Sequence, residues 1–356
     1  MGRRGRNAGG VHGILLVDKP VGPTSHDLVG WVRRLVGSRR VGHCGTLDPA
    51  ASGLLVIAVG VATRAVSLMS AADKTYRAEV ILGRKTDSGD REGKVIDEVE
   101  VEVSPEIAEA AIKAAYDLVG EHQIAPPAHS AIKVDGERAY ARIRRGEVVE
   151  MELRTMKVLS VDNVEVCVDV PGKVRVSLDM CVSKGTYVRS LAELLGARLG
   201  LPAYLGGLRR LACGDLRVDA PRALHPQAED QGEEARWRWT IRLDPGSEGP
   251  EKAPPGALLP LDKTLDLPTF ELDQASPLFT RLTQGQALRC GQIEIRDRQP
   301  GELVSLVARD PEGALATLIL ARVTEAERAD TESSRDLDHI LRPERVLHID
   351  KVAPSA

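Results

Sequence analysis

The order of apolar and polar residues along this chain predicts strands and helices that follow one another without regular alternation. The continuous apolar runs Ile14–Val17 and Leu54–Val59 each predict a buried strand. Between these runs, Ser25 is expected to cap a helix. The apolar residues of that helix recur every three or four positions and are Leu28, Trp31, Val32, Leu35 and Val36.

The middle of the chain continues this mixed pattern. Alternation over Tyr76–Leu82 predicts a strand, and two alternating stretches, Val164–Val170 and Val174–Val182, predict a hairpin. One helix is expected to begin at Ser104-Pro105, and another is expected over Tyr187–Arg198. Because strands and helices do not alternate one by one, the pattern favours an α+β domain with a mixed, largely antiparallel sheet.

Composition divides the chain into five parts. Residues 1–10 are rich in glycine and arginine and are expected to form a flexible basic arm, followed by a large domain over residues 11–225. Residues 226–256 are acidic and rich in proline and glycine, as in an insertion or a linker. A second, β-rich pattern covers residues 257–323, and residues 324–356 form a charged tail.

Size and composition bound the class of protein. With 356 residues, 42% of them hydrophobic, the chain suits a soluble protein with one large and one small domain. It has no apolar run of the roughly 20 residues that a membrane span needs, and no signal-peptide core, so we expect a cytoplasmic protein without membrane contact. The five cysteines form no CxxC pair and the eight histidines lack metal-binding spacing, so no metal site is predicted.

The net charge of −4 does not favour a uniformly basic surface, but arginines gather at a few places. Local contacts to phosphate govern affinity for RNA, so such clusters are consistent with RNA binding. Solvated arginines on helix faces are the alternative interpretation. The clustered residues are Arg3, Arg4, Arg6, Arg33, Arg34, Arg39, Arg40, Arg142, Arg144, Arg145, Arg209 and Arg210.

The segment RRVGHCGTLDP at positions 39–49 places one carboxylate on a loop that follows two arginines. Gly42 and Gly45 permit backbone conformations that a Cβ would obstruct, and Pro49 fixes φ directly after Asp48. The loop is therefore a candidate for presenting Asp48 rigidly, with cationic side chains nearby to receive a phosphate. A tight turn capped by Asp48 explains the local sequence equally well.

Four further blocks surround this loop: GILLVDKPVGPTS at 13–25, DKTYR at 73–77, SKGTYVRS at 183–190 and LRRL at 208–211. In this order and spacing they resemble the TruB family of tRNA pseudouridine synthases. The resemblance covers about Gly13 to Val218 and continues more faintly beyond. It implies a pseudouridine synthase domain, with a flexible insertion at 125–147 that closes over the RNA arm, and a small PUA-like RNA-binding domain at 257–323.

The resemblance assigns roles to individual residues. It implies that Asp48 is the catalytic nucleophile and that Arg189 is its basic partner, with an ordinary surface ion pair as the alternative for Arg189. Lys19 matches the first motif and is expected to support the catalytic loop from behind.

The resemblance also implies an RNA-contacting set. Tyr76 and Tyr187 match aromatic residues of the uridine pocket, and Leu208 matches its apolar wall. His43 matches a histidine that supports the extruded base by stacking or shape. An aromatic face and an aliphatic wall suit a base that has left its stack.

The implied reaction is the isomerisation of the T-loop uridine of tRNA, position 55 in tRNA convention. Because the reaction changes neither redox state nor composition, it requires no cofactor and no metal. The expected partner is the tRNA T-arm, bound by a monomer that needs no protein partner. A tRNA-folding chaperone with dispensable catalysis and the guide-RNA-dependent branch of the superfamily remain alternatives. Since every matched motif precedes residue 226, we expect deletion of residues 226–255 to leave catalysis intact.

Overall fold

The protein is described from a computed structural model. The described residues are 10–325 and 340–349, without positions 103, 128, 131, 135, 140, 141, 143, 144, 146, 148, 150, 171, 172, 233, 234, 236, 237, 247, 248, 294, 296 and 297. The basic arm, most of the charged tail and Arg144 therefore lie outside the described residues. Within them, no helix is long and apolar enough to cross a membrane.

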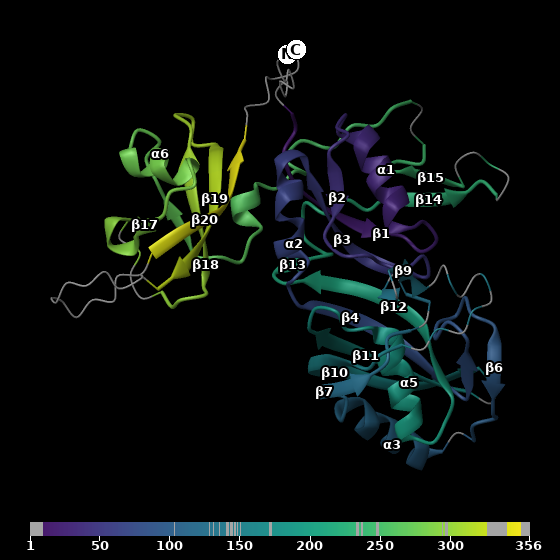
Figure 1. Ribbon diagram of the computed structural model, residues 1–356. Helices are drawn as coiled ribbons and strands as arrows, with labels where there is room; N and C mark the ends of the chain where they lie inside the picture. Colours follow the sequence, from purple (N-terminus) through teal and green to yellow (C-terminus); the bar gives the residue numbers. More distant parts are fainter. Residues whose placement is uncertain are drawn as a thin grey trace.

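The larger sheet confirms the expected α+β domain with mostly antiparallel pairing (Figure 1). Its strand order is β1-β3-β12-β4-β11-β10-β7, with β2 paired to β3 and β13 to β12, and only β12 and β3 run parallel among these described pairs. The strands are β1 (Gly13–Lys19), β2 (Val41–His43), β3 (Ala51–Val59), β4 (Lys74–Leu82), β7 (Gly120–Ile124), β10 (Arg154–Val170), β11 (Lys173–Val182), β12 (Ala203–Cys213) and β13 (Leu216–Arg217).

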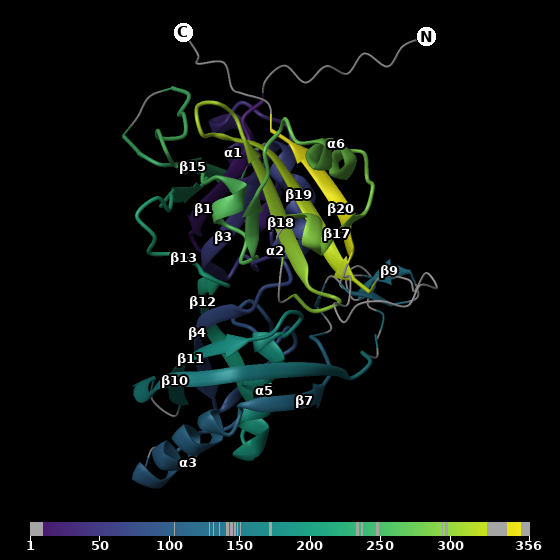
Figure 2. The ribbon, with the colours of Figure 1, turned by 90° about the vertical axis from the view of Figure 1, so that its left-hand side faces the viewer.

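Three of the described helices, each 11 or 12 residues long, cover this sheet. Helix α1 (Ser25–Leu35) packs its apolar stripe against β1 and β3, and Leu28 and Val32 are fully buried there. Helices α3 (Pro105–Tyr116) and α5 (Val188–Arg198) cover β4, β10, β11 and β12 at the other end (Figures 1 and 2). The helical spacing thus identified the buried face of α1 correctly, because a period of 3.6 places every third or fourth residue on one side.

The cap of α1 differs from the prediction. Thr24, not Ser25, is the N-cap, and it forms a capping box with Asp27. The hydroxyl of Ser25 instead exchanges 2.9 Å hydrogen bonds with the main chain of Leu47. Ser25 therefore connects the start of α1 to the loop that carries Asp48.

The C-terminal region forms a separate sheet in the order β16-β18-β19-β20-β17. We expected this unit to end at residue 323, but β20 lies inside the sheet and extends it to His348. The elements are η2 (Leu261–Lys263), β16 (Thr269–Glu271), α6 (Pro277–Thr283), β17 (Leu288–Arg289), η3 (Cys290–Ile293), β18 (Leu303–Arg309), β19 (Leu315–Thr324) and β20 (Ile340–His348).

One apolar cluster joins the two sheets. It combines Ile14, Leu54 and Ala65 of the large domain with Leu320 and Leu347 of the C-terminal sheet. Arg345 adds hydrogen bonds to the carbonyl of Arg64 and the hydroxyl of Ser67 at the rim. The C-terminal sheet is therefore docked on the large domain through a shared core.

Smaller elements complete the chain. The acidic segment folds as the hairpin β14 (Gln227–Asp230) and β15 (Trp239–Arg242), which lies beside α1 (Figure 1). The remaining elements are η1 (Gly60–Ala65), α2 (Val66–Met69), β5 (Arg84–Thr86), β6 (Val95–Glu98), β8 (Lys133–Val134) and β9 (Glu137–Arg138).

Candidate active site

Asp48 lies on the loop that connects β2 to β3. The amide of Cys44 donates to the carbonyl of Val56 at 2.8 Å, and the amide of Ala51 donates to the carbonyl of Asp48 at 3.1 Å. Gly45 adopts φ +126°, a conformation that favours glycine, and Leu47 points into the core with 3% exposure. The loop is thus a closed turn anchored on its own strand, with the Asp48 side chain 47% exposed.

Two buried cations hold this loop through its carbonyl groups. Lys19 is fully buried, and its Nζ donates to the carbonyls of Pro20 (3.0 Å), Pro49 (3.3 Å) and Ala51 (2.6 Å). Burial lowers the pKa of Lys19 to about 8, and the Asp48 carboxylate opposes that shift. At neutral pH the ammonium group still has three protons for three acceptors. The structure therefore places Lys19 behind the loop, where the sequence predicted it.

Arg210 is the second cation behind the loop. It is 2% exposed, and its guanidinium donates to the carbonyls of Gly45 (3.1 Å), Thr46 (3.3 Å) and Leu54 (2.6 Å). Arg209 pairs with Asp18 through two hydrogen bonds of 3.0 and 2.7 Å. Both arginines belong to the clusters predicted to contact phosphate. For Arg210 that prediction is wrong, because its guanidinium is buried against the carbonyls behind the loop.

Arg189, in the first turn of α5, approaches Asp48 from the other side. Its Nη2 lies 3.1 Å from Oδ2 of Asp48, and its Nη1 lies 3.4 Å from Oδ2 of Asp90. The same guanidinium donates to the carbonyls of Ser88 (3.0 Å) and His129 (3.2 Å). With 9% of its side chain exposed, this is no ordinary surface ion pair, because a buried guanidinium needs such a set of partners.

Sequence reasoning missed Asp90. It follows a turn-rich stretch, and its side chain is only 12% exposed beside Arg189. Its Oδ1 accepts a 2.7 Å hydrogen bond from the hydroxyl of Ser88. The residues at 87–90, Asp-Ser-Gly-Asp, are typical of a turn. Nothing in that local pattern points to a distant arginine on α5.

A small cavity opens beside the Asp48–Arg189 pair. Its walls include both of these residues together with Asp90 and Leu208, and the bulged part of β12 closes it at Gly206 and Gly207. Leu208 pairs with Ala51 at the end of the loop that carries Asp48, through the parallel contact of β12 and β3. This pairing explains how Leu208, 160 positions after Asp48 in the sequence, reaches the loop.

The two predicted tyrosines lie at the start of α5 and on β4, and neither lines the small cavity. Tyr187 is the N-cap residue of α5, two positions before Arg189, and burial raises the pKa of its phenol. Tyr76 lies on β4 opposite Arg210 and is half-buried. Both Tyr76 and Leu208 pack against the same apolar cluster below the sheet.

His43 ends β2 at the entrance to the loop. Burial, and then the charge of Arg210, lower the pKa of its imidazole, and its Nδ1 is buried without a hydrogen-bond partner among the described residues. These properties suit a neutral imidazole ring that makes packing contacts and does not transfer a proton.

The adjacent Cys44 is 1% exposed, and burial raises the pKa of its thiol to about 12, which disfavours a thiolate nucleophile at this position.

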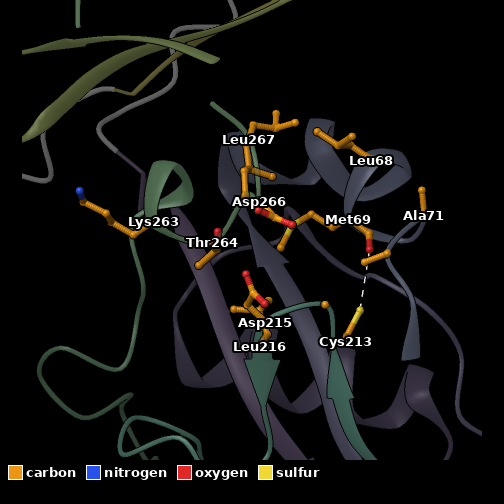
Figure 3. A pocket seen from close by; sticks show the side chains of 13 residues that line it. Leu68, Met69, Ala71, Cys213, Asp215, Leu216, Lys263, Thr264, Asp266 and Leu267 are labelled. Carbon is orange, nitrogen blue, oxygen red and sulfur yellow. Dashed lines mark hydrogen bonds between the residues drawn. The ribbon is translucent and has the colours of Figure 1, made fainter. Parts of the chain in front are cut away.

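A larger cavity, of about 370 Å³, lies away from this chemistry. Leu68, Met69, Cys213, Leu216 and Leu267 are among its lining residues, and the thiol of Cys213 faces the carbonyl of Met69 at 3.8 Å (Figure 3). None of the predicted site residues lines it. We place the candidate active site at the smaller cavity, because that is where charged groups converge.

Comparison with known proteins connects this geometry to a family. The model of the TruB family pseudouridylate synthase N-terminal domain matches residues 33–188, a range that contains Asp48, Tyr76 and Tyr187. "tRNA pseudouridine synthase B" of Cupriavidus taiwanensis is 36% identical over 341 residues, which cover 95% of this chain and 95% of that protein. The chain belongs to the TruB family.

A second relative agrees with this assignment, and a solved structure has the same fold. "tRNA pseudouridine synthase B" of Ralstonia nicotianae is 40% identical over 270 residues, covering 73% of this chain and 84% of that protein. The crystal structure of a Cbf5-Nop10-Gar1 complex contains a chain that superimposes with a TM-score of 0.61 at 24% identity, covering 96% of this chain and 87% of that one. At that identity the match shows a shared fold.

Proposed function

We propose that this TruB family protein is a tRNA pseudouridine synthase that converts the T-loop uridine at position 55 to pseudouridine, with Asp48 as nucleophile. One observation carries the proposal. The Asp48 carboxylate is half-exposed at a cavity, yet its backbone is fixed from behind and one oxygen is held by a buried guanidinium. A nucleophile needs this combination of access and fixed direction.

The reaction breaks the C1′–N1 glycosidic bond, turns the uracil and joins C1′ to C5. The proton on C5 is lost and N1 gains one, so the composition of the nucleotide does not change. The target nucleotide must first leave its stack to reach Asp48. In our proposal Tyr76, Tyr187 and Leu208 replace the lost stacking contacts, and His43 supports the extruded conformation from the entrance side.

Arg189 orients the nucleophile in this proposal. Its two remaining hydrogen bonds, to the carbonyls of Ser88 and His129, fix the guanidinium to segments outside the catalytic loop. Asp90 adds a second carboxylate, so that the charge of Arg189 is shared between two acids. With five N–H donors a planar guanidinium can serve these two carboxylates and two carbonyls at once, whereas the ammonium group of a lysine has only three.

The RNA partner is proposed as the tRNA T-arm, bound by a monomer without a protein partner or a cofactor. Arg34, Arg39 and Arg40 are exposed near α1 and β2 and are available for phosphate contacts. We further propose that the C-terminal sheet over residues 269–348 is the PUA-like RNA-binding unit, docked through the core that it shares with the large domain.

The decisive test maps pseudouridine at single-nucleotide resolution in an unmodified tRNA transcript. The purified chain is incubated with the transcript without cofactor or added protein. We expect conversion of the T-loop uridine alone. Conversion elsewhere would refute the position, and tRNA binding without conversion would favour the alternative of a folding chaperone or a missing partner.

A further inference from the structure

The hairpin β14–β15 packs on the catalytic domain and is no free linker. Ile241 is 6% exposed and belongs to the apolar cluster formed by α1, β1 and β3. The amide of Ala253 donates to the carbonyl of Leu35 at the end of α1. The acidic segment is thus fixed to α1 at both its middle and its end.

Trp239 of this hairpin lies directly on Gly22. A Cβ added at Gly22 would lie 2.8 and 2.9 Å from Cζ2 and Cζ3 of the indole and closer still to Cη2, so the ring occupies the space of the missing side chain. Gly22 has φ +112°, a conformation in which glycine is favoured. The ring itself is covered by the guanidinium of Arg238, 5.5 Å from its centroid, and Arg238 is paired with Asp230.

Gly22 is connected to the catalytic loop. Its amide donates to the carbonyl of Pro49 at 2.9 Å, one residue after Asp48. On one side of the Gly22 turn, Lys19 donates to the same carbonyl of Pro49, and on the other, Ser25 bonds to both main-chain groups of Leu47. Both neighbours of Asp48 are therefore tied to the segment 19–25, and Trp239 contacts that segment at Gly22.

We infer that Trp239 is a positioning residue for the catalytic aspartate. The inference rests on the proposed function and extends it to a segment outside the matched motifs. A turn centred on glycine has no side chain of its own to pack, so its conformation depends on what lies against it. The indole provides that contact and excludes water from the Gly22–Pro49 hydrogen bond, which keeps Asp48 at a fixed angle to the cavity. This replaces our expectation that residues 226–255 are dispensable for catalysis.

The test compares Trp239→Ala and Trp239→Phe in the full chain, with Ile241→Val as the matched control. Ile241 is two residues further along the same strand, and its shortening disturbs the packing on α1 without touching Gly22. Two readouts are needed. One is the amide exchange rate of Gly22 and of residues 44–48, 50 and 51. The other is the single-turnover rate of pseudouridine formation, measured together with the KM for tRNA.

For Trp239→Ala we expect exchange at Gly22 to rise about 10-fold or more, because its hydrogen bond opens locally. We expect the single-turnover rate to fall about 10-fold with KM within twofold, because a misdirected nucleophile slows chemistry rather than binding. Trp239→Phe should recover most of the rate, since a ring still covers Gly22. Ile241→Val should lower the melting temperature slightly and change neither readout.

Unchanged exchange at Gly22 in a folded Trp239→Ala protein would overturn the inference, whatever its activity. A higher KM for tRNA with an unchanged single-turnover rate would overturn the inference too, since the hairpin would then act by contacting the RNA. If exchange responds but the unaltered protein forms no pseudouridine, the mechanical coupling is supported and the proposed function is refuted. If Trp239→Ala does not fold, Trp239→Phe and Trp239→Leu decide between the same outcomes.

Discussion

The loop that carries Asp48 and the C-terminal sheet are both held against the rest of the large domain, but by different forces. The loop is held by donors on buried polar side chains, namely Lys19, Arg210 and Ser25, each directed at main-chain groups. The C-terminal sheet is held by apolar contacts, with Leu320 and Leu347 in the shared core. Hydrogen bonds fix direction, whereas apolar burial mainly adds stability. The comparison therefore predicts that damage to the loop support lowers the chemical rate, while damage to the sheet junction lowers stability.

The largest expected effect is that of Asp48→Asn. An amide keeps the shape of the side chain but is a poor nucleophile, so we expect the rate to fall at least about 10³-fold. Binding of the tRNA should remain, since the exposed arginines are untouched. Single-turnover pseudouridine formation and a filter-binding assay measure the two quantities. Persistent turnover in this variant would show that Asp48 is not the nucleophile.

Arg189→Lys is expected to have the next largest effect. An ammonium group cannot reach two carboxylates and two carbonyls together, so the rate should fall about 10²-fold. Asp90→Asn is the matched variant, because it changes one partner of Arg189 and leaves the contact with Asp48. We expect its loss of rate to be smaller. Equal losses in the two variants would indicate that Asp90 has a role of its own in the reaction.

Arg210→Met tests the support of the loop without touching the cavity. Three carbonyl groups lose their donor, and we expect a cost of about 3 kcal/mol in the free energy of unfolding. The rate should fall as well, because Gly45 and Thr46 are freed beside Asp48. Chemical denaturation and single-turnover assays at a temperature where the variant is folded check both. A loss of stability with an unchanged rate would mean that Lys19 and Ser25 suffice to direct the loop.

At the sheet junction, Leu347→Ala should behave in the opposite way. Leu347 is fully buried, and its truncation should cost about 2–5 kcal/mol. Because no catalytic group contacts it, we expect the single-turnover rate of the folded protein to stay within about twofold. Arg345→Ala, at the rim of the same junction, should cost less than about 1 kcal/mol. A tenfold fall in rate with either variant would show that the junction also positions the active site.

The same comparison explains how much the sequence predicted. Apolar periodicity located α1 and β3, because the spacing of apolar residues within one segment shows whether it buries one face of a helix or a whole strand. The family resemblance pointed to Asp48 and Arg189, and the structure brings these two side chains into contact. Asp90 and Trp239 could not be found in this way, because each contacts a residue more than 90 positions away along the chain, Arg189 and Gly22 respectively. Arg210 was misassigned because local sequence does not show whether an arginine in a strand faces solvent or a carbonyl.

The smallest expected effect concerns His43 and pH. Burial lowers the pKa of its imidazole in the folded protein below the ordinary value of 6.5. As the pH falls below 6.5, the unfolded chain takes up a proton at His43 before the folded chain does, so the stability from this group is present above that pH and lost on acidification. His43→Gln lacks the titrating group. Its melting temperature should therefore fall less steeply than that of the unaltered protein between pH 7.5 and 5. Parallel curves would mean that the ring of His43 is protonated as readily in the folded protein as in the unfolded chain, and the interpretation of a neutral ring supporting the extruded base by shape would then be wrong.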